Sequence, residues 1–200
     1  MKNHETTLPE GYREIKHINA LDKKLGLILN LVAVLVLAAV AAIACIPVFL
    51  GSSELKYDSV VSLLVTGVFL AGCIVYIVLH ELVHGIAYKA LTHEKLTFGF
   101  TWSCAYCGVP NIYVYRRASL IALVAPLITF TLILIPVTVA LYFVSLPFYF
   151  ASAMLLGMHL GGCSGDIYMT LLLLFKYRDP ALLVRDTGPE QYLYLKESES

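Results

Sequence analysis

Two histidines and a glutamate lie inside an apolar segment, in the stretch YIVLHELVHGIAY from Tyr76 to Tyr88. His80, Glu81 and His84 form an H-E-x-x-H pattern, and side chains at positions i and i+4 of a helix lie on one face. Both imidazoles can therefore bind one metal ion, with the glutamate close enough to take a proton from water. Ionisable residues inside a membrane segment are costly and mark functional sites. The motif predicts a zinc site with Glu81 as the catalytic base.

Asp166 is the predicted third metal ligand. A catalytic zinc site usually has three protein ligands and one open position, and the long apolar segments contain only two acidic residues, Glu81 and Asp166. Counted along helices, His80 lies about 20 residues, or about 30 Å, into its segment, and Asp166 about 18 residues, or about 27 Å, into its own. Because both segments are expected to cross in the same direction, the two residues are expected at one depth.

Other interpretations of these residues stay open. Cys163 lies three residues before Asp166 and is the rival third ligand, because a thiolate binds zinc well. Asp166 can instead hydrogen-bond a ligand histidine without touching the metal. His159, seven residues before Asp166, can hydrogen-bond the site, stabilise a transition-state oxyanion or satisfy a backbone carbonyl. The H-E-x-x-H residues can also form a buried polar cluster that only holds helices together.

The composition is that of a membrane protein. Of the 200 residues, 59% are hydrophobic and 14% are charged, whereas an average soluble domain is about 25% charged. Four apolar segments, at 26–50, 59–88, 118–146 and 148–175, each reach the roughly 20 residues that cross a hydrocarbon core. The first is too long for the apolar part of a secretory signal. We predict an all-α polytopic membrane protein, with four transmembrane helices in a single domain over residues 1–200.

Basic residues are distributed asymmetrically around these segments. All but one of the 14 lie before the first segment, between the second and third, or after the fourth, and Lys56 is the exception. Because short loops rich in lysine and arginine stay in the cytoplasm, both termini and the loop at 89–117 are expected there. The net charge is zero and no basic stripe is present, so we expect no nucleic-acid partner.

The loop between the second and third segments has two β-rich stretches, KLTFGFTWS and NIYVYRR, on either side of the turn-like CAYCGVPN. We predict a short β-hairpin-like cytoplasmic loop next to the metal, whose edge can hold an extended peptide by strand addition. An ordinary amphipathic loop at the lipid headgroups is the alternative. Cys104 and Cys107 form a lone C-x-x-C pair without the second pair of a structural zinc site, so we expect ordinary loop residues, with a metal-binding or redox role as the alternative.

The stretches HELVHG and GCSGD, with RRASLIALVAP between them, resemble a family of small bacterial membrane proteins described as putative zincin peptidases. More broadly, they resemble the site-2 protease class of intramembrane zinc metalloproteases, in which a membrane-embedded H-E-x-x-H is joined by an Asp from a later span. The resemblance implies that His80, His84 and Asp166 bind one zinc ion per chain and that Glu81 is the base. It also implies a location in the bacterial cytoplasmic membrane.

The predicted function is that of a zinc-dependent intramembrane endopeptidase, which hydrolyses peptide bonds of membrane-associated proteins near the cytoplasmic leaflet. One alternative is a non-proteolytic metal-binding membrane protein, a regulator or chaperone, which would not depend on Glu81. Another is a small transporter, which the lack of an evident inverted repeat disfavours. The expected partners are the bilayer, a membrane protein or peptide substrate and a separate regulatory chain. The sequence identifies neither the substrate-binding residues nor the oligomeric state.

Overall fold

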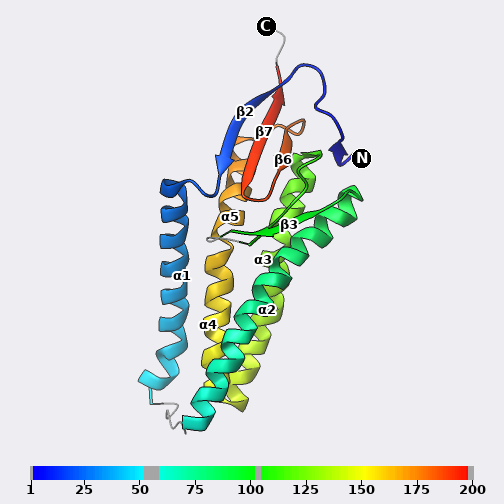
Figure 1. Ribbon diagram of the computed structural model, residues 1–200. Coiled ribbons are helices and arrows are strands. Elements are labelled where there is room, and N and C mark those ends of the chain that lie inside the picture. Colours follow the sequence, from blue (N-terminus) through cyan, green and yellow to red (C-terminus); the bar gives the residue numbers. More distant parts are fainter. Residues whose placement is uncertain (1, 52–58, 102–104, 198–200) are drawn as a thin grey trace. The chain divides into compact units, whose positions relative to one another are not determined.

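The computed structural model describes residues 2–51, 59–101 and 105–197 (Figure 1). Lys56 and Cys104, both used in the sequence analysis, lie outside these residues. The chain divides into two compact units, which are described separately. The first unit comprises Met1–Leu27, Val78–Pro126 and Gly165–Ser200, and the second comprises Ile28–Ile77 and Leu127–Ser164.

Within the described residues, four helical segments are long and apolar enough to cross a membrane. They are α1 (Lys23–Phe49), α2 (Ser59–Thr92), α3 (Arg116–Val144) and a last segment, Leu146–Lys176, made of α4 (Leu146–Gly162), α5 (Ser164–Leu171) and the π-helical turn η1 (Leu172–Lys176). A helix pairs the backbone groups of such a segment internally, which lipid requires. The four segments match the predicted ones to within a few residues.

The last segment is interrupted at the sequence GGCSG. α4 ends at Gly162 and α5 begins at Ser164, with Cys163 donating its backbone N–H to the His159 carbonyl over 3.0 Å. Glycine is a poor helix former, so a break here costs little. The interruption places Asp166 in the first turn of α5.

The predicted all-α class is wrong, because the first unit contains two antiparallel sheets. The larger sheet has the strand order β1-β5-β6-β7-β2, and Figure 1 shows β2, β7 and β6 side by side. Its strands are β1 (His4–Glu5), β2 (Tyr12–Asn19), β5 (Tyr113–Tyr115), β6 (Leu183–Asp186) and β7 (Glu190–Lys196). The fold is therefore mixed α/β.

Apolar residues in the polar-looking chain ends explain this sheet. Val184 of β6 pairs with Leu193 of β7, and both side chains are buried. They pack in one cluster with Leu123 of α3 and with Met169 and Leu173 of the last segment. Burial of each such side chain contributes about 1.5–3 kcal/mol. The cluster therefore packs the sheet against the start of α3 and against the part of the last segment that follows Asp166.

The predicted hairpin between the second and third helices is present, but its strands differ from those expected. β3 (Thr97–Phe100) pairs with β4 (Ala105–Gly108), with Phe98 opposite Cys107. The stretch expected to turn therefore contributes a strand. Tyr113–Tyr115 instead forms β5, which pairs with β1 and β6 in the larger sheet.

In the second unit, α4 packs on α1 through glycines. A Cβ atom on Gly161 would lie 2.7 Å from the Ala33 carbonyl oxygen, and one on Gly157 would lie 2.8 Å from Leu37 Cδ1. Small residues at four-residue spacing allow this close approach of helices in lipid. The two glycines therefore fix the contact between the first and last membrane segments of this unit.

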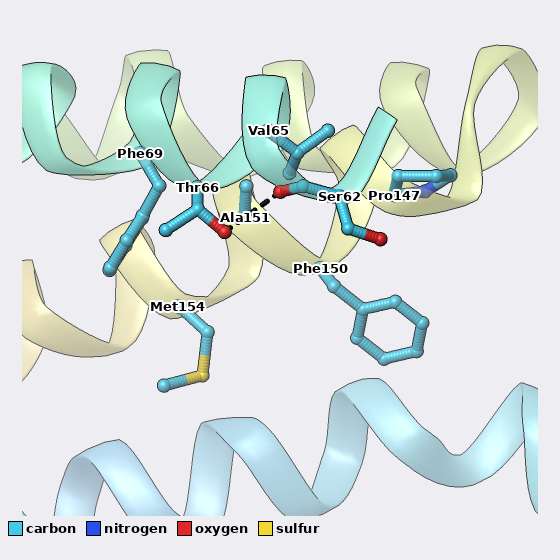
Figure 2. Close-up of a pocket in the computed structure, with 8 residues that line it drawn as sticks. All are labelled: Ser62, Val65, Thr66, Phe69, Pro147, Phe150, Ala151 and Met154. Atoms are coloured by element: carbon cyan, nitrogen blue, oxygen red, sulfur yellow. Dashed lines mark hydrogen bonds between the residues drawn. The ribbon is translucent and has the colours of Figure 1, made fainter. Parts of the chain in front are cut away.

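The second unit also carries an apolar groove of about 270 Å³ between residues of α2 and α4 (Figure 2). Its lining includes the large apolar side chains of Phe69, Phe150 and Met154. Thr66, which also lines it, donates its hydroxyl to the Ser62 carbonyl over 2.8 Å. Because that hydroxyl is used within the helix, the groove presents an apolar surface.

Candidate metal centre

The structure brings together the three residues predicted to bind metal. His80 and His84 lie on α2, each 8% exposed, and Asp166 lies on α5. Asp166 Oδ2 is 3.3 Å from His80 Nε2 and 3.4 Å from His84 Nε2. One ligand atom from each residue lies within 4.8 Å of the others. All three belong to the first unit.

A backbone contact fixes the orientation of the His84 ring. His84 Nδ1 lies 2.9 Å from the carbonyl oxygen of Ala122 on α3. A carbonyl can only accept a hydrogen bond, so Nδ1 carries the proton and donates it, and Nε2, which lies near Asp166, is the nitrogen that can bind a metal. Metal-binding histidines usually have such a partner on the second ring nitrogen. Ala122 is fully buried, so this carbonyl is held by packing.

These donors fit a zinc ion. Two imidazole nitrogens and one carboxylate oxygen form a zinc ligand set that leaves one position open. Ligand atoms about 2.0–2.1 Å from a tetrahedral zinc lie about 3.3 Å apart, and the two distances from Asp166 Oδ2 are 3.3 and 3.4 Å. A direct charge-assisted hydrogen bond is typically shorter, about 2.7–2.9 Å. The two distances are compatible with ligands arranged around an ion.

Glu81 lies next to the β3–β4 hairpin. The backbone of Cys107 on β4 lies near its carboxylate. One turn later, a Cβ atom on Gly85 would lie 2.7 Å from Phe98 Cζ of β3, so the hairpin packs directly on α2. The proposed base and an extended backbone are therefore neighbours.

A family model described as "Putative zincin peptidase" matches residues 73–180 of the chain. The chain belongs to this family. Membership supports a zinc metallopeptidase in general, and the matched segment contains His80, Glu81, His84 and Asp166. Neither a curated protein nor a solved structure matches the chain.

Beyond the segment matched by the zincin peptidase family, Asp186 approaches the site from β6, and the sequence analysis missed it. Tyr88 donates its hydroxyl to Asp186 Oδ2 over 2.6 Å, and the Gly188 N–H is 2.9 Å from Oδ1. Tyr88 is 2% exposed and Asp186 4%. Burial raises the pKa of Asp186 to about 6, although the hydrogen bonds from Tyr88 and Gly188 act in the opposite direction.

The Asp186 backbone also joins the larger sheet to the hairpin. Its carbonyl accepts the Val109 N–H over 2.8 Å, directly after β4. A Cβ atom on Gly108 would lie 2.6 Å from the Gly188 nitrogen. The turn between β6 and β7 therefore supports the strand beside Glu81. The sequence contains a signal for one partner of the Tyr88–Asp186 hydrogen bond, since Tyr88 continues the four-residue spacing of His80 and His84.

His159 lies in the second unit and is fully buried. Its Nδ1 is 2.9 Å from the Tyr76 hydroxyl and 3.7 Å from Cys163 Sγ, and its Nε2 is 3.1 Å from the Thr131 hydroxyl. Both ring nitrogens thus have polar neighbours in their own unit. The catalytic role of His159 and the role of Cys163 as rival ligand stay predictions.

Cys107 is a buried thiol in β4. Burial, followed by the charges of Asp186 and Glu81, raises its pKa to about 12. Without a bound metal, this side chain is therefore a protonated thiol at neutral pH, and the thiolate is the reactive form of cysteine. The interpretation of Cys107 as an ordinary loop residue changes only in that it lies on a strand.

Proposed function

We propose that the protein is a zinc-dependent intramembrane endopeptidase, which hydrolyses peptide bonds of membrane-associated proteins near the cytoplasmic leaflet. One observation carries the proposal: the convergence of His80, His84 and Asp166 beside Glu81, on helices long enough and apolar enough to cross a membrane. Family membership supports the zinc peptidase part. The intramembrane location and the substrate class are inferences from the helices.

In this proposal, His80 Nε2, His84 Nε2 and the Asp166 carboxylate hold the zinc ion. When bound, zinc supplies a Lewis acid that makes water more acidic and polarises a carbonyl group. Glu81 accepts a proton from the attacking water and passes it to the departing amine. The bond from His84 Nδ1 to the Ala122 carbonyl keeps the ring in the tautomer that can bind metal.

A substrate helix hides its carbonyl groups in its own hydrogen bonds, so it must unwind before it is cleaved. We propose that the β3–β4 hairpin receives the extended segment by strand addition. The supporting observation is that the backbone of Cys107 reaches the Glu81 carboxylate. The buried turn at Asp186 and Gly188 then acts as a support for β4.

We further propose that the protein lies in the bacterial cytoplasmic membrane with both termini in the cytoplasm. The basic residues support this orientation. The first and last strands lie in one sheet, which supports a location of both chain ends on the same side. The hairpin belongs to the same unit as that sheet.

The test compares the wild type with Glu81→Gln on single-span membrane peptides in detergent or vesicles, with cleavage sites read by mass spectrometry. Glu94→Gln, which changes a half-buried glutamate after α2 that lies near His4, is the matched control. We expect Glu81→Gln to lose cleavage by about 10²-fold or more while it keeps its zinc, and Glu94→Gln to cleave normally. Wild-type cleavage by a zinc-loaded Glu81→Gln protein would sink the mechanism and favour a metal-binding protein without peptidase activity.

A further inference from the structure

A buried imidazole joins three membrane helices of the second unit. His159 of α4 is fully buried, and its Nδ1 lies 2.9 Å from the Tyr76 hydroxyl of α2. Its Nε2 lies 3.1 Å from the Thr131 hydroxyl of α3. A neutral imidazole has one donor and one acceptor nitrogen, and a hydroxyl can be either, so both contacts are satisfied in one tautomer. These three side chains, the His159 cluster, have no part in the mechanism described above.

Aromatic packing restricts the imidazole further. The centroid of the Phe130 ring on α3 lies 5.8 Å from that of His159 and 5.1 Å from that of Tyr76. Tyr76 and Phe130 are both buried. A polar group that loses its hydrogen bond in such surroundings cannot turn to water instead, so the loss costs free energy. The cluster therefore ties α2, α3 and α4 together at one level, as side-chain hydrogen bonds between membrane helices do.

The His159 cluster is built on the last turn of α4, directly before the break in the last membrane segment. The His159 carbonyl accepts the Cys163 N–H over 3.0 Å, and this bond closes the helix. Cys163 is fully buried, with its Sγ 3.7 Å from His159 Nδ1. Gly162 and Gly165 flank the break, and glycine gives a chain little stiffness of its own. The contacts of His159 therefore determine where α4 ends.

Both chain segments that carry the proposed metal ligands pass through this cluster. Tyr76 precedes His80 by four residues on the same helix, α2, so their side chains lie on one face. On the last segment, Asp166 follows Cys163 by three residues, in the first turn of α5. A displacement of the α4 end is passed along the chain to Asp166. Because zinc–ligand distances vary by only about 0.2 Å, such a displacement weakens metal binding.

We propose that the His159 cluster positions the metal centre, by fixing the point at which α4 ends and the helix that carries Asp166 begins. His159 is then a positioning residue and not a ligand or an oxyanion stabiliser, since each of its ring nitrogens has a hydroxyl partner in the cluster. The inference rests on the zinc site of the proposed function, but it does not require that any substrate is cleaved.

The test measures the dissociation constant for zinc of the full chain in detergent, by competition with a chromophoric chelator. Tyr76→Phe and Thr131→Val each remove one hydroxyl of the cluster with little change of volume. The matched control is Thr138→Val, which removes a 2.7 Å hydrogen bond to Ser152 that is also buried between α3 and α4, about three helical turns before the break. Cobalt(II) is loaded in parallel, because its visible absorption reports the geometry of its ligands.

We expect Tyr76→Phe and Thr131→Val to bind zinc about tenfold more weakly than the wild type, with altered cobalt(II) bands. Thr138→Val should lower the thermal midpoint similarly but keep the wild-type affinity and spectrum. An equal loss of affinity in the control would reduce the cluster to ordinary packing and overturn the inference. Wild-type affinity in both folded cluster variants would overturn it alone, whereas a wild type that binds no zinc would overturn the proposed function as well.

Discussion

Tyr88→Phe tests the support that the C-terminal sheet gives to the site. The change deletes one oxygen atom, which donates to Asp186 over 2.6 Å where both side chains are almost fully buried. Asp186 then keeps the Gly188 N–H as its remaining side-chain partner named above. A hydrogen bond to a charged group is worth about 1.5–3 kcal/mol. We therefore expect the free energy of unfolding to fall by about 2 kcal/mol at pH 8.

The pH dependence of this loss identifies its cause. The pKa of Asp186 is raised from the 3.8 of an exposed group to about 6, so folding favours the protonated form. The contribution of protonated Asp186 to the free energy of unfolding is therefore fully present below pH 4 and is lost as the pH rises through 6. This change amounts to at most about 3 kcal/mol. At pH 4 the hydrogen bond is neutral, and the cost of Tyr88→Phe should shrink to about 1 kcal/mol.

The assay is denaturant unfolding in detergent, followed by circular dichroism at pH 4, 6 and 8 on chelator-treated protein. Asp186→Asn should abolish most of the pH dependence that the wild type shows between pH 4 and 7. Tyr113→Phe, in the same sheet but only half-buried, is the matched control and should cost little at any pH. If Tyr88→Phe cost nothing at pH 8, or the same amount at every pH, the Tyr88–Asp186 pair would not have the role assigned to it.

Three further predictions concern packing and the metal. Gly161→Val should lower the free energy of unfolding by about 1–3 kcal/mol, because its side chain clashes with the Ala33 carbonyl. Gly162→Ala, whose Cβ meets nothing within 4 Å, should leave the stability unchanged or raise it. Equal thermal midpoints of the two variants would contradict this packing. Gly188→Ala should cost 1 kcal/mol or more, because its φ is +99°, and it should slow substrate cleavage with zinc still bound; normal cleavage would show that the turn does not support β4. A chelator should lower the thermal midpoint of the wild type and leave that of Asp166→Ala unchanged. If zinc had been at 100 times its Kd, its removal lowers the free energy of unfolding by about 2.7 kcal/mol.

The membrane helices and the residues of the proposed site were predictable because their signals are local. A long apolar run can pair its backbone only within a helix, and ionisable residues in such a run are rare enough to count. Counting the acidic residues of the apolar segments identified Asp166 as the candidate third ligand. Its distances to His80 and His84 depend on how two distant segments pack, since Asp166 follows His80 by 86 residues. In the sequence, only the equal depth of the two sites indicated this proximity.

The five-stranded sheet was not predicted because its pairings are non-local. β2 pairs with β7 across almost the whole chain, and each strand alone looks like a polar tail. For the same reason no sequence pattern singled out Asp186, although it is buried against Tyr88. The hairpin was misplaced because Ala105–Gly108 contains small and turn-forming residues whose strand conformation depends on pairing with β3.

The central claim is that H-E-L-V-H and Asp166 form a zinc site, and metal content of detergent-purified protein tests it most directly. The wild type is measured by atomic spectroscopy beside His80→Ala, Asp166→Ala and Cys163→Ala, after zinc is supplied. The account predicts about one zinc per chain, lost in the first two variants and kept in the third. A folded wild type without zinc would contradict the account and reduce the motif to a contact between helices, and loss of zinc in Cys163→Ala alone would replace Asp166 with Cys163 as the third ligand.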